Sequence, residues 1–87
     1  MNKDIETNIE LQRILREWDP FKVGAGFYDT EAADAIQAVH QTDNPGQLAS
    51  KIQEIYEFSF EEKVPLSSCK EVALRLLHIK NNAACEL

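Results

Sequence analysis

Apolar residues recur three and four positions apart in four separate segments, and this repeat constrains the fold more than any other feature of the sequence. The spacing matches the 3.6-residue turn of an α-helix, so each segment predicts a helix with one apolar face. The residues that carry the repeat are Leu11, Ile14, Leu15 and Trp18; Ala32, Ala35, Ile36 and Val39; Leu48, Ile52, Ile55 and Tyr56; and Cys69, Val72, Ala73, Leu76 and Leu77, extended by Leu74 and Ile79.

Capping and helix-breaking residues set the expected ends of these helices. Ser, Thr, Asp and Asn side chains accept hydrogen bonds from free amides at a helix start, and proline fits the first turn. The expected limits are Asp4 or Thr7 to Trp18, a start at Asp29 or Thr30, Asn44-Pro45 to Ser59 or Phe60, and Ser67 or Ser68 to Asn81-Asn82.

We therefore expect an all-α fold, a compact four-helix domain in which the bundle is partly irregular. The chain has 87 residues, enough for one core and too few for two. Residues 1–87 thus form a single helical domain, with frayed ends at residues 1–4 and 82–87.

The connection between the first two helices, WDPFKVGAGFY, is unusually apolar for a loop. We expect most of its large side chains (Phe21, Val23, Phe27 and Tyr28) to be buried, as a lid over one end of the core. Its glycines are expected to supply the reversal of the chain, and Asp29 to cap the next helix. The structural residues of this loop are Trp18, Pro20, Phe21, Gly24, Gly26, Phe27 and Tyr28.

The charge balance argues against several classes of protein. Fifteen acidic and nine basic residues give a net charge of −6, which repels nucleic-acid phosphates. No apolar run approaches the roughly 18 residues of a membrane span, and the start lacks the apolar region of a signal peptide. We expect a cytoplasmic protein that binds neither nucleic acid nor membranes.

No group of residues indicates catalysis, a metal site or a cofactor. Cys69 and His78 fall on opposite sides of one helix, and Cys69 and Cys85 are expected to remain thiols. Asp29, Glu31 and Asp34 suit the start of a helix better than a cation site. Gly24-Ala25-Gly26 lacks the lysine and third glycine of phosphate loops. We expect no enzymatic activity.

The residues Trp18-Asp19-Pro20, Tyr28-Asp29, Asp34-Ala35-Ile36 and the segment from Phe58-Ser59-Phe60 to Cys69 resemble the YugE-like family of small proteins from Bacillus and its relatives. The resemblance covers roughly Leu11 to Lys80. It implies an all-helical domain of unknown function in a bacterial protein, with no catalytic residues to carry over. The Trp-Asp-Pro turn and Tyr-Asp pair are also similar to small acidic immunity proteins of bacterial toxin systems.

The leading hypothesis for function is a small non-enzymatic interaction domain, whose partner is another protein or a second copy in a homodimer. Alternatives are an immunity-type protein that binds a basic toxin, and a small-molecule-binding domain with a pocket under the Trp18 to Tyr28 loop. The residues expected to meet a partner are Asp19, Asp29, Glu31, Asp34, Glu61 and Glu62.

Overall fold

The computed structural model describes the backbone of residues 3–85 and the side chains of residues 5–24 and 26–82. Within that part of the chain all regular structure is helical, so the predicted all-α four-helix fold is confirmed. The elements are α1 (Lys3–Trp18), the short 3₁₀ helix η1 (Ala25–Tyr28), α2 (Asp29–Gln41), α3 (Pro45–Phe60) and α4 (Leu66–Cys85).

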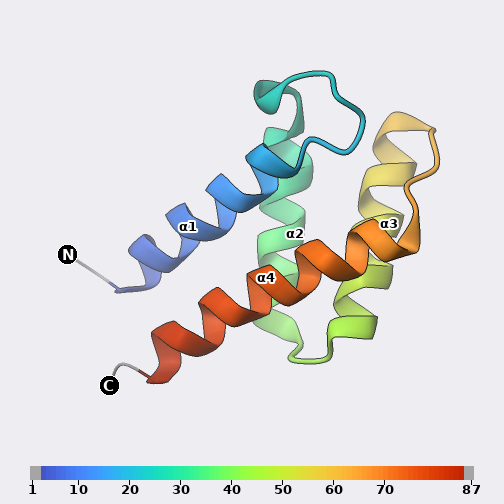
Figure 1. Cartoon of the computed structure of the whole chain (residues 1–87). Helices are drawn as coiled ribbons and strands as arrows, with labels where there is room; N and C mark the ends of the chain where they lie inside the picture. Colours follow the sequence, from blue (N-terminus) through green and yellow to red (C-terminus); the bar gives the residue numbers. More distant parts are fainter. Residues whose placement is uncertain (1–2, 86–87) are drawn as a thin grey trace.

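The four long helices form two crossed pairs (Figure 1). α1 and α4 lie side by side and run in opposite directions, and α2 and α3 form a second antiparallel pair behind them. The loop from Asp19 to Gly24 and η1 lie together at one end, beside the C-terminal turns of α1 and the start of α2. At this end of the molecule the rings of Trp18, Phe21, Tyr28, Tyr56 and Phe60 pack together.

The core lies between the two pairs, and the helical repeat predicted most of it. Nearly all of the expected apolar positions are buried, whereas Trp18, Ile36, Ile55 and Ile79 are half-buried at its margin. Leu74 is the exception, because it is 56% exposed on the outer side of α4. The buried set is Leu11, Ile14, Leu15, Tyr28, Ala32, Ala35, Ala38, Val39, Leu48, Ala49, Ile52, Tyr56, Val64, Cys69, Val72, Ala73, Leu76 and Leu77.

The predicted C-terminal end of α1 and both predicted ends of α3 are confirmed, whereas α1 begins at Lys3 and thus before the expected start at Asp4 or Thr7. α1 ends at Trp18, and α3 begins after Asn44, whose side chain accepts a hydrogen bond from the Gln47 amide at 3.0 Å. α3 ends at Phe60 because Glu61 adopts a left-handed conformation (φ 55°) while its amide still donates to the Glu57 carbonyl at 2.8 Å.

The predicted cap of α2 and both predicted ends of α4 are wrong. α2 begins at Asp29 with Tyr28 at the capping position and no side-chain cap, so neither Asp29 nor Thr30 caps it. α4 begins at Leu66, one residue before the expected serine caps, because the Pro65 carbonyl already accepts from the Cys69 amide at 3.2 Å. α4 also continues to Cys85 instead of ending at Asn81-Asn82.

The expected fraying of residues 1–4 and 82–87 falls partly outside the described residues. Positions 1, 2, 86 and 87 lie outside them, whereas α1 already begins at Lys3 and α4 includes residues 82–85. The Cys85 side chain also lies outside the described part, so the expectation of a free thiol there remains a prediction.

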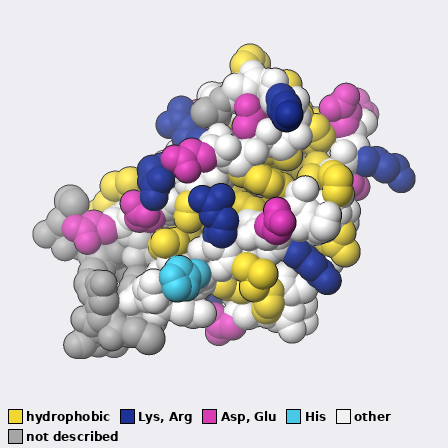
Figure 2. All heavy atoms as spheres, viewed as in Figure 1, with side chains coloured by type: hydrophobic (Ala, Val, Ile, Leu, Met, Phe, Trp, Pro, Cys, Tyr) yellow, Lys and Arg dark blue, Asp and Glu magenta, His cyan; other side chains and the backbone are white. Residues whose placement is uncertain are grey.

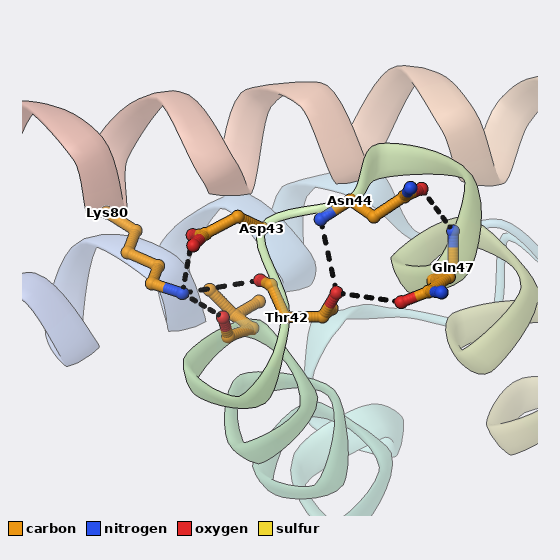
Figure 3. A network of polar contacts seen from close by, with 6 residues as sticks. Thr42, Asp43, Asn44, Gln47 and Lys80 are labelled. Carbon is orange, nitrogen blue, oxygen red and sulfur yellow. Dashed lines mark hydrogen bonds and ion pairs between the residues drawn. The ribbon is translucent and has the colours of Figure 1, made fainter.

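The C-terminal end of α2 is held by a lysine from α4 (Figure 3). The Lys80 ammonium donates to the Val39 carbonyl at 2.8 Å and the Thr42 carbonyl at 3.3 Å, and it pairs with Asp43 at 2.9 Å. Carbonyls at a helix end lack partners within the helix and carry partial negative charge, so a cation there is favourable. Lys80 thus fastens the α2–α3 turn to α4.

We expect Lys80→Met to lower the free energy of unfolding by about 1 to 2 kcal/mol, because the hydrocarbon stem remains while the charged hydrogen bonds are lost. Lys70→Met, at an exposed position of the same helix, is the matched control. Denaturant unfolding of both variants measures the difference. Equal stability of the two variants would show that the lysine contacts contribute nothing net.

Candidate functional site

The loop between α1 and α2 is anchored by an aromatic cluster. The Tyr28 ring lies 5.6 Å from the Tyr56 ring and 5.3 Å from the Phe60 ring, between centroids. Trp18 meets Tyr56 edge-on at 5.1 Å, and Phe21 lies 4.9 Å from Phe60. Aromatic pairs at these separations favour packing beyond their burial alone. The space beneath the loop is thus filled by side chains, which lends no support to a small-molecule pocket there.

The Asp19 carboxylate is hydrogen-bonded to several groups of the loop that follows it. Its carboxylate accepts hydrogen bonds from the Tyr28 hydroxyl at 2.5 Å, the Val23 amide at 3.0 Å and the Gly24 amide at 3.2 Å. The Tyr28 hydroxyl in turn accepts from the Phe21 amide at 3.1 Å. The hydrogen bond from Tyr28, followed by those from the backbone amides, lowers the pKa of Asp19. The carboxylate of Asp19 therefore has a structural role in the loop.

The lid predicted for this loop is wrong in part. Tyr28 is fully buried and Phe21 is half-buried, but Val23 is 44% and Phe27 is 68% exposed. The cause is the 3₁₀ turn of η1, which directs Tyr28 inward and its neighbour Phe27 outward. Tyr28, with Phe21 half-buried against the core, closes this end, and the other two large side chains do not contribute as predicted.

The reversal of the loop also differs from the prediction. Gly24 has a positive φ of 108°, but Gly26 does not, and left-handed conformations occur at Asp19 (φ 37°) and Lys22 (φ 56°) instead. Gly26 has no atom within 4 Å of the place where a Cβ would lie. Asp19 can adopt this backbone because its carboxylate bonds the local amides.

The chemically reactive side chains lie apart. Cys69 is fully buried, and burial, with a smaller effect of Glu57, raises its thiol pKa to about 11, so it is protonated near neutral pH. His78 is exposed on the same helix and contacts Asn82 at 3.1 Å, while His40 contacts Asn8 at 2.8 Å. The described residues contain no group of three or more potential metal ligands.

A surface shared by α2 and α3 carries two adjoining grooves, which both include Asp34 and Ile55. One, of about 300 Å³, continues along Gln37, Ala38, Gln41 and Lys51. The other, of about 190 Å³, extends to Glu54, Phe58 and Ser59. Phe58 is 86% exposed, the highest value among the exposed large apolar residues. We name Asp34, Glu54, Ile55, Phe58 and Ser59 the acidic–aromatic surface.

The acidic residues selected from the sequence do not form one cluster. Asp34 lies on the acidic–aromatic surface, whereas Asp29 lines a different groove, between α1 and α2. Glu31 is only 9% exposed. The exposed Glu61 and Glu62 follow the end of α3. The Asp19 carboxylate is hydrogen-bonded within the loop between α1 and α2.

Sequence reasoning missed Glu54, Ile55 and Phe58 as surface residues of a site. A signal for Phe58 existed, because it lies ~120° from the direction of Ile52 on a helical projection and so points away from the apolar stripe. The proximity of Glu54 to Asp34 had no such signal, because it depends on how α2 packs against α3.

Two further grooves involve α1. One, of about 390 Å³ between α1 and α2, includes Ile5 and Ile9, which are 53% and 55% exposed. The other, of about 360 Å³ between α1 and α4, is lined by Arg13, Ile14, Leu74, Arg75, His78 and Ile79. None of the helices, within the described residues, is long and apolar enough to cross a bilayer.

Comparisons with known proteins find relatives over most of the chain. A family model described as Domain of unknown function (DUF1871) matches residues 10–86. Uncharacterized protein YugE of Bacillus subtilis (strain 168) is 51% identical over 76 residues, which cover 87% of this chain and 88% of YugE. A crystal structure of a protein from Bacillus stearothermophilus has a TM-score of 0.87 and 44% identity, covering 90% of this chain and 96% of that one.

Proposed function

This chain belongs to the DUF1871 family of domains of unknown function, and from that premise we propose that it is a protein-interaction domain without an enzymatic activity of its own. The observation that carries the proposal is the 86% exposure of Phe58 in the groove that Asp34 and Glu54 also line. Aromatic residues are enriched at protein interfaces, where a partner removes their rings from water.

The charges of this surface favour a basic partner. Asp34 and Glu54 both line the groove that contains Phe58, and Lys51, which lines the adjoining groove, is 3.9 Å from Glu54. The net charge of −6 adds long-range attraction for a cationic protein. We therefore propose a partner that places an apolar side chain on Phe58 and a lysine or arginine near Asp34.

An immunity-type role is the same proposal with a basic toxin as the partner. It is favoured by the same two features, the exposed ring and the carboxylates beside it. The identity of the captured protein separates this role from a general interaction domain.

Affinity capture with paired variants tests the proposal. We expect Phe58→Ser and Asp34→Lys each to reduce recovery of a specific partner by at least about tenfold, since hot-spot substitutions of this kind cost more than about 1.4 kcal/mol. Phe27→Ser and Glu71→Lys change an exposed phenylalanine and an exposed glutamate elsewhere, so both should keep the partner. Circular-dichroism melts establish that all four variants are folded.

Two results would contradict the proposal. One is the absence of any protein that the wild-type chain enriches over a column without bait. The other is equal recovery by all four variants, which would place the binding surface elsewhere. Light scattering on the same samples identifies the case in which the partner is a second copy.

A further inference from the structure

We propose that the groove between α1 and α4 is a second binding site, which accepts a short amphipathic helix whose apolar side chains are flanked by carboxylates. The site is separate from the acidic–aromatic surface, and the inference does not depend on the function proposed above. Its lining residues are Arg13, Ile14, Leu74, Arg75, His78 and Ile79.

The floor of the groove is aliphatic. Leu74 is 56% exposed, although it lies on a helix whose other leucines in the described part, apart from Leu66 at its start, are buried in the core. Ile79 is half-buried, and Ile14 is 3% exposed at the base. An apolar side chain placed here would cover Leu74 and remove that surface from water, which is favourable.

The edges of the groove are cationic, in contrast to the net charge of the chain. All three arginines of the sequence lie on α1 and α4, and Arg13 and Arg75 line the groove together with His78. Figure 2 shows Lys and Arg side chains beside apolar atoms on the face formed by these helices, with Asp and Glu side chains among them. Guanidinium groups bind carboxylates through paired hydrogen bonds, so acidic residues beside an apolar stripe match these edges.

Of the two arginines that line the groove, Arg13 is paired with neighbouring carboxylates. Arg13 is paired within α1 with Glu10 at 2.8 Å and Glu17 at 3.1 Å. On α4, Glu71 lies one turn before Arg75 but does not line the groove. Arg75 is therefore the stronger attraction for an anionic group.

The shape favours a helix over a small enclosed ligand. The walls remain largely exposed, with Arg13 at 54% and Leu74 at 56%, so the groove is a shallow channel between two antiparallel helices. A third helix fits such a channel by ridge-into-groove packing, and peptide helices bind in this way through apolar residues one turn apart.

The charges oppose a second copy of the chain. A two-fold interface built on this groove would place the same patch on both sides, so the arginines of one copy would face those of the other. Like charges in such a contact cost binding energy. An acidic partner helix avoids this cost.

The test uses a fluorescent 15-residue peptide with leucines at positions i, i+3, i+4 and i+7 and glutamates beside them. Fluorescence anisotropy measures its affinity for the full chain, and chemical shifts of the Leu74 and Ile79 amides report its position. The same peptide with lysine in place of glutamate is the charge control. We expect the glutamate peptide to bind at least about tenfold more tightly.

Variants with matched controls locate the site. We expect Arg75→Glu and Leu74→Ala each to weaken binding of the glutamate peptide by about tenfold, from one reversed charge pair and a few lost methyl contacts. Lys70→Glu and Leu66→Ala make the same changes at exposed positions of α4 outside the groove and should change binding less than about twofold.

Three outcomes would overturn the inference. One is the absence of binding of the glutamate peptide, and another is an equal effect of the groove variants and their controls. The third is a decanoate anion that shifts the Leu74 and Ile79 amides when the peptide does not, which would assign the groove to a small aliphatic acid.

Discussion

Replacing Tyr28 with alanine is expected to lower the free energy of unfolding by about 3 to 5 kcal/mol, the cost of removing a buried aromatic ring from a packed core. Tyr28 is fully buried, and its ring lies against those of Tyr56 and Phe60. Its hydroxyl also joins the loop to Asp19 and to the Phe21 amide. Because small domains have a total stability of about 5 to 15 kcal/mol, this single change takes a large share of it.

Two companion variants separate the contributions. Tyr28→Phe keeps the ring and removes the hydroxyl, which leaves the Phe21 amide without its partner and should cost about 1 to 2 kcal/mol. Phe27→Ala removes the neighbouring ring, which is 68% exposed, and should change stability by less than about 0.5 kcal/mol. Urea unfolding with circular dichroism measures all three. Equal losses for Phe27→Ala and Tyr28→Ala would contradict the assigned packing of the loop.

The fold was predictable because helical periodicity is a local property of the sequence. Leu11 and Leu15 in α1 are four positions apart, as are Leu48 and Ile52 in α3, so each pair lies on one face of its helix. All four are buried, as that spacing predicted. The two adjacent aromatics of the loop have no such repeat. Tyr28 is buried and Phe27 is exposed because of the 3₁₀ turn that contains them, which sequence spacing did not reveal.

The surfaces were less predictable than the fold for a related reason. Asp34 was selected from the sequence, but Glu54 and Phe58 join it only because α2 packs against α3. Likewise, Arg13 and Arg75 are 62 positions apart in the chain and meet through the pairing of α1 with α4. The composition gave a net charge of −6 for the whole chain, but a net charge does not reveal where basic residues such as Arg13 and Arg75 come together.

The motif residues that carried the family resemblance have a structural explanation. Trp18-Asp19-Pro20 and Tyr28-Asp29 carried the resemblance to the YugE-like family, and within them Asp19 and Tyr28 bond each other while Trp18 packs on Tyr56. These contacts stabilise the conformation of the loop between α1 and α2. A search for function is therefore better directed to the exposed residues of the helices.

Alkaline pH is expected to destabilise the domain strongly, because three buried groups must remain protonated in the folded state. Burial raises the pKa values of Tyr28, Tyr56 and Cys69. A neighbouring side chain raises each value further: Asp19 for Tyr28, Glu31 for Tyr56 and Glu57 for Cys69. For Cys69 the change is from 9.0 to about 11.

The sign follows from proton binding. A raised folded-state pKa means that, above the unfolded pKa, the unfolded chain has lost a proton that the folded chain keeps, so stability falls as pH rises. The contribution of Cys69 is complete below about pH 8.5 and is lost towards pH 11, a loss of about 2 kcal/mol, whereas the contributions of the two tyrosines begin to fall only above about pH 10. Denaturant unfolding from neutral pH upward, under reducing conditions, measures the decline.

Absorbance gives an independent measurement. The sequence has two tyrosines, and both are fully buried, so tyrosinate should form only as the chain unfolds. Its near-ultraviolet absorbance and the loss of helical circular dichroism should therefore change together with pH. Tyrosinate that forms with the ordinary midpoint of about pH 10 in a fully helical chain would show that the rings are open to solvent.

Tyr56→Phe removes a buried hydroxyl of the core that lacks a hydrogen-bond partner in the described part of the chain. The Tyr56 hydroxyl is buried and has no hydrogen-bond partner among the described residues, so its removal should leave stability at neutral pH unchanged or raise it by up to about 1 kcal/mol. The decline above about pH 10 should also become shallower, because one of the two buried tyrosines no longer titrates on unfolding. Cys69→Ala should flatten the earlier part of that decline while costing stability at neutral pH through a small cavity. A destabilised Tyr56→Phe variant with an unchanged pH profile would mean that the hydroxyl has a partner in solution, and would reassign the alkaline transition to groups outside this core.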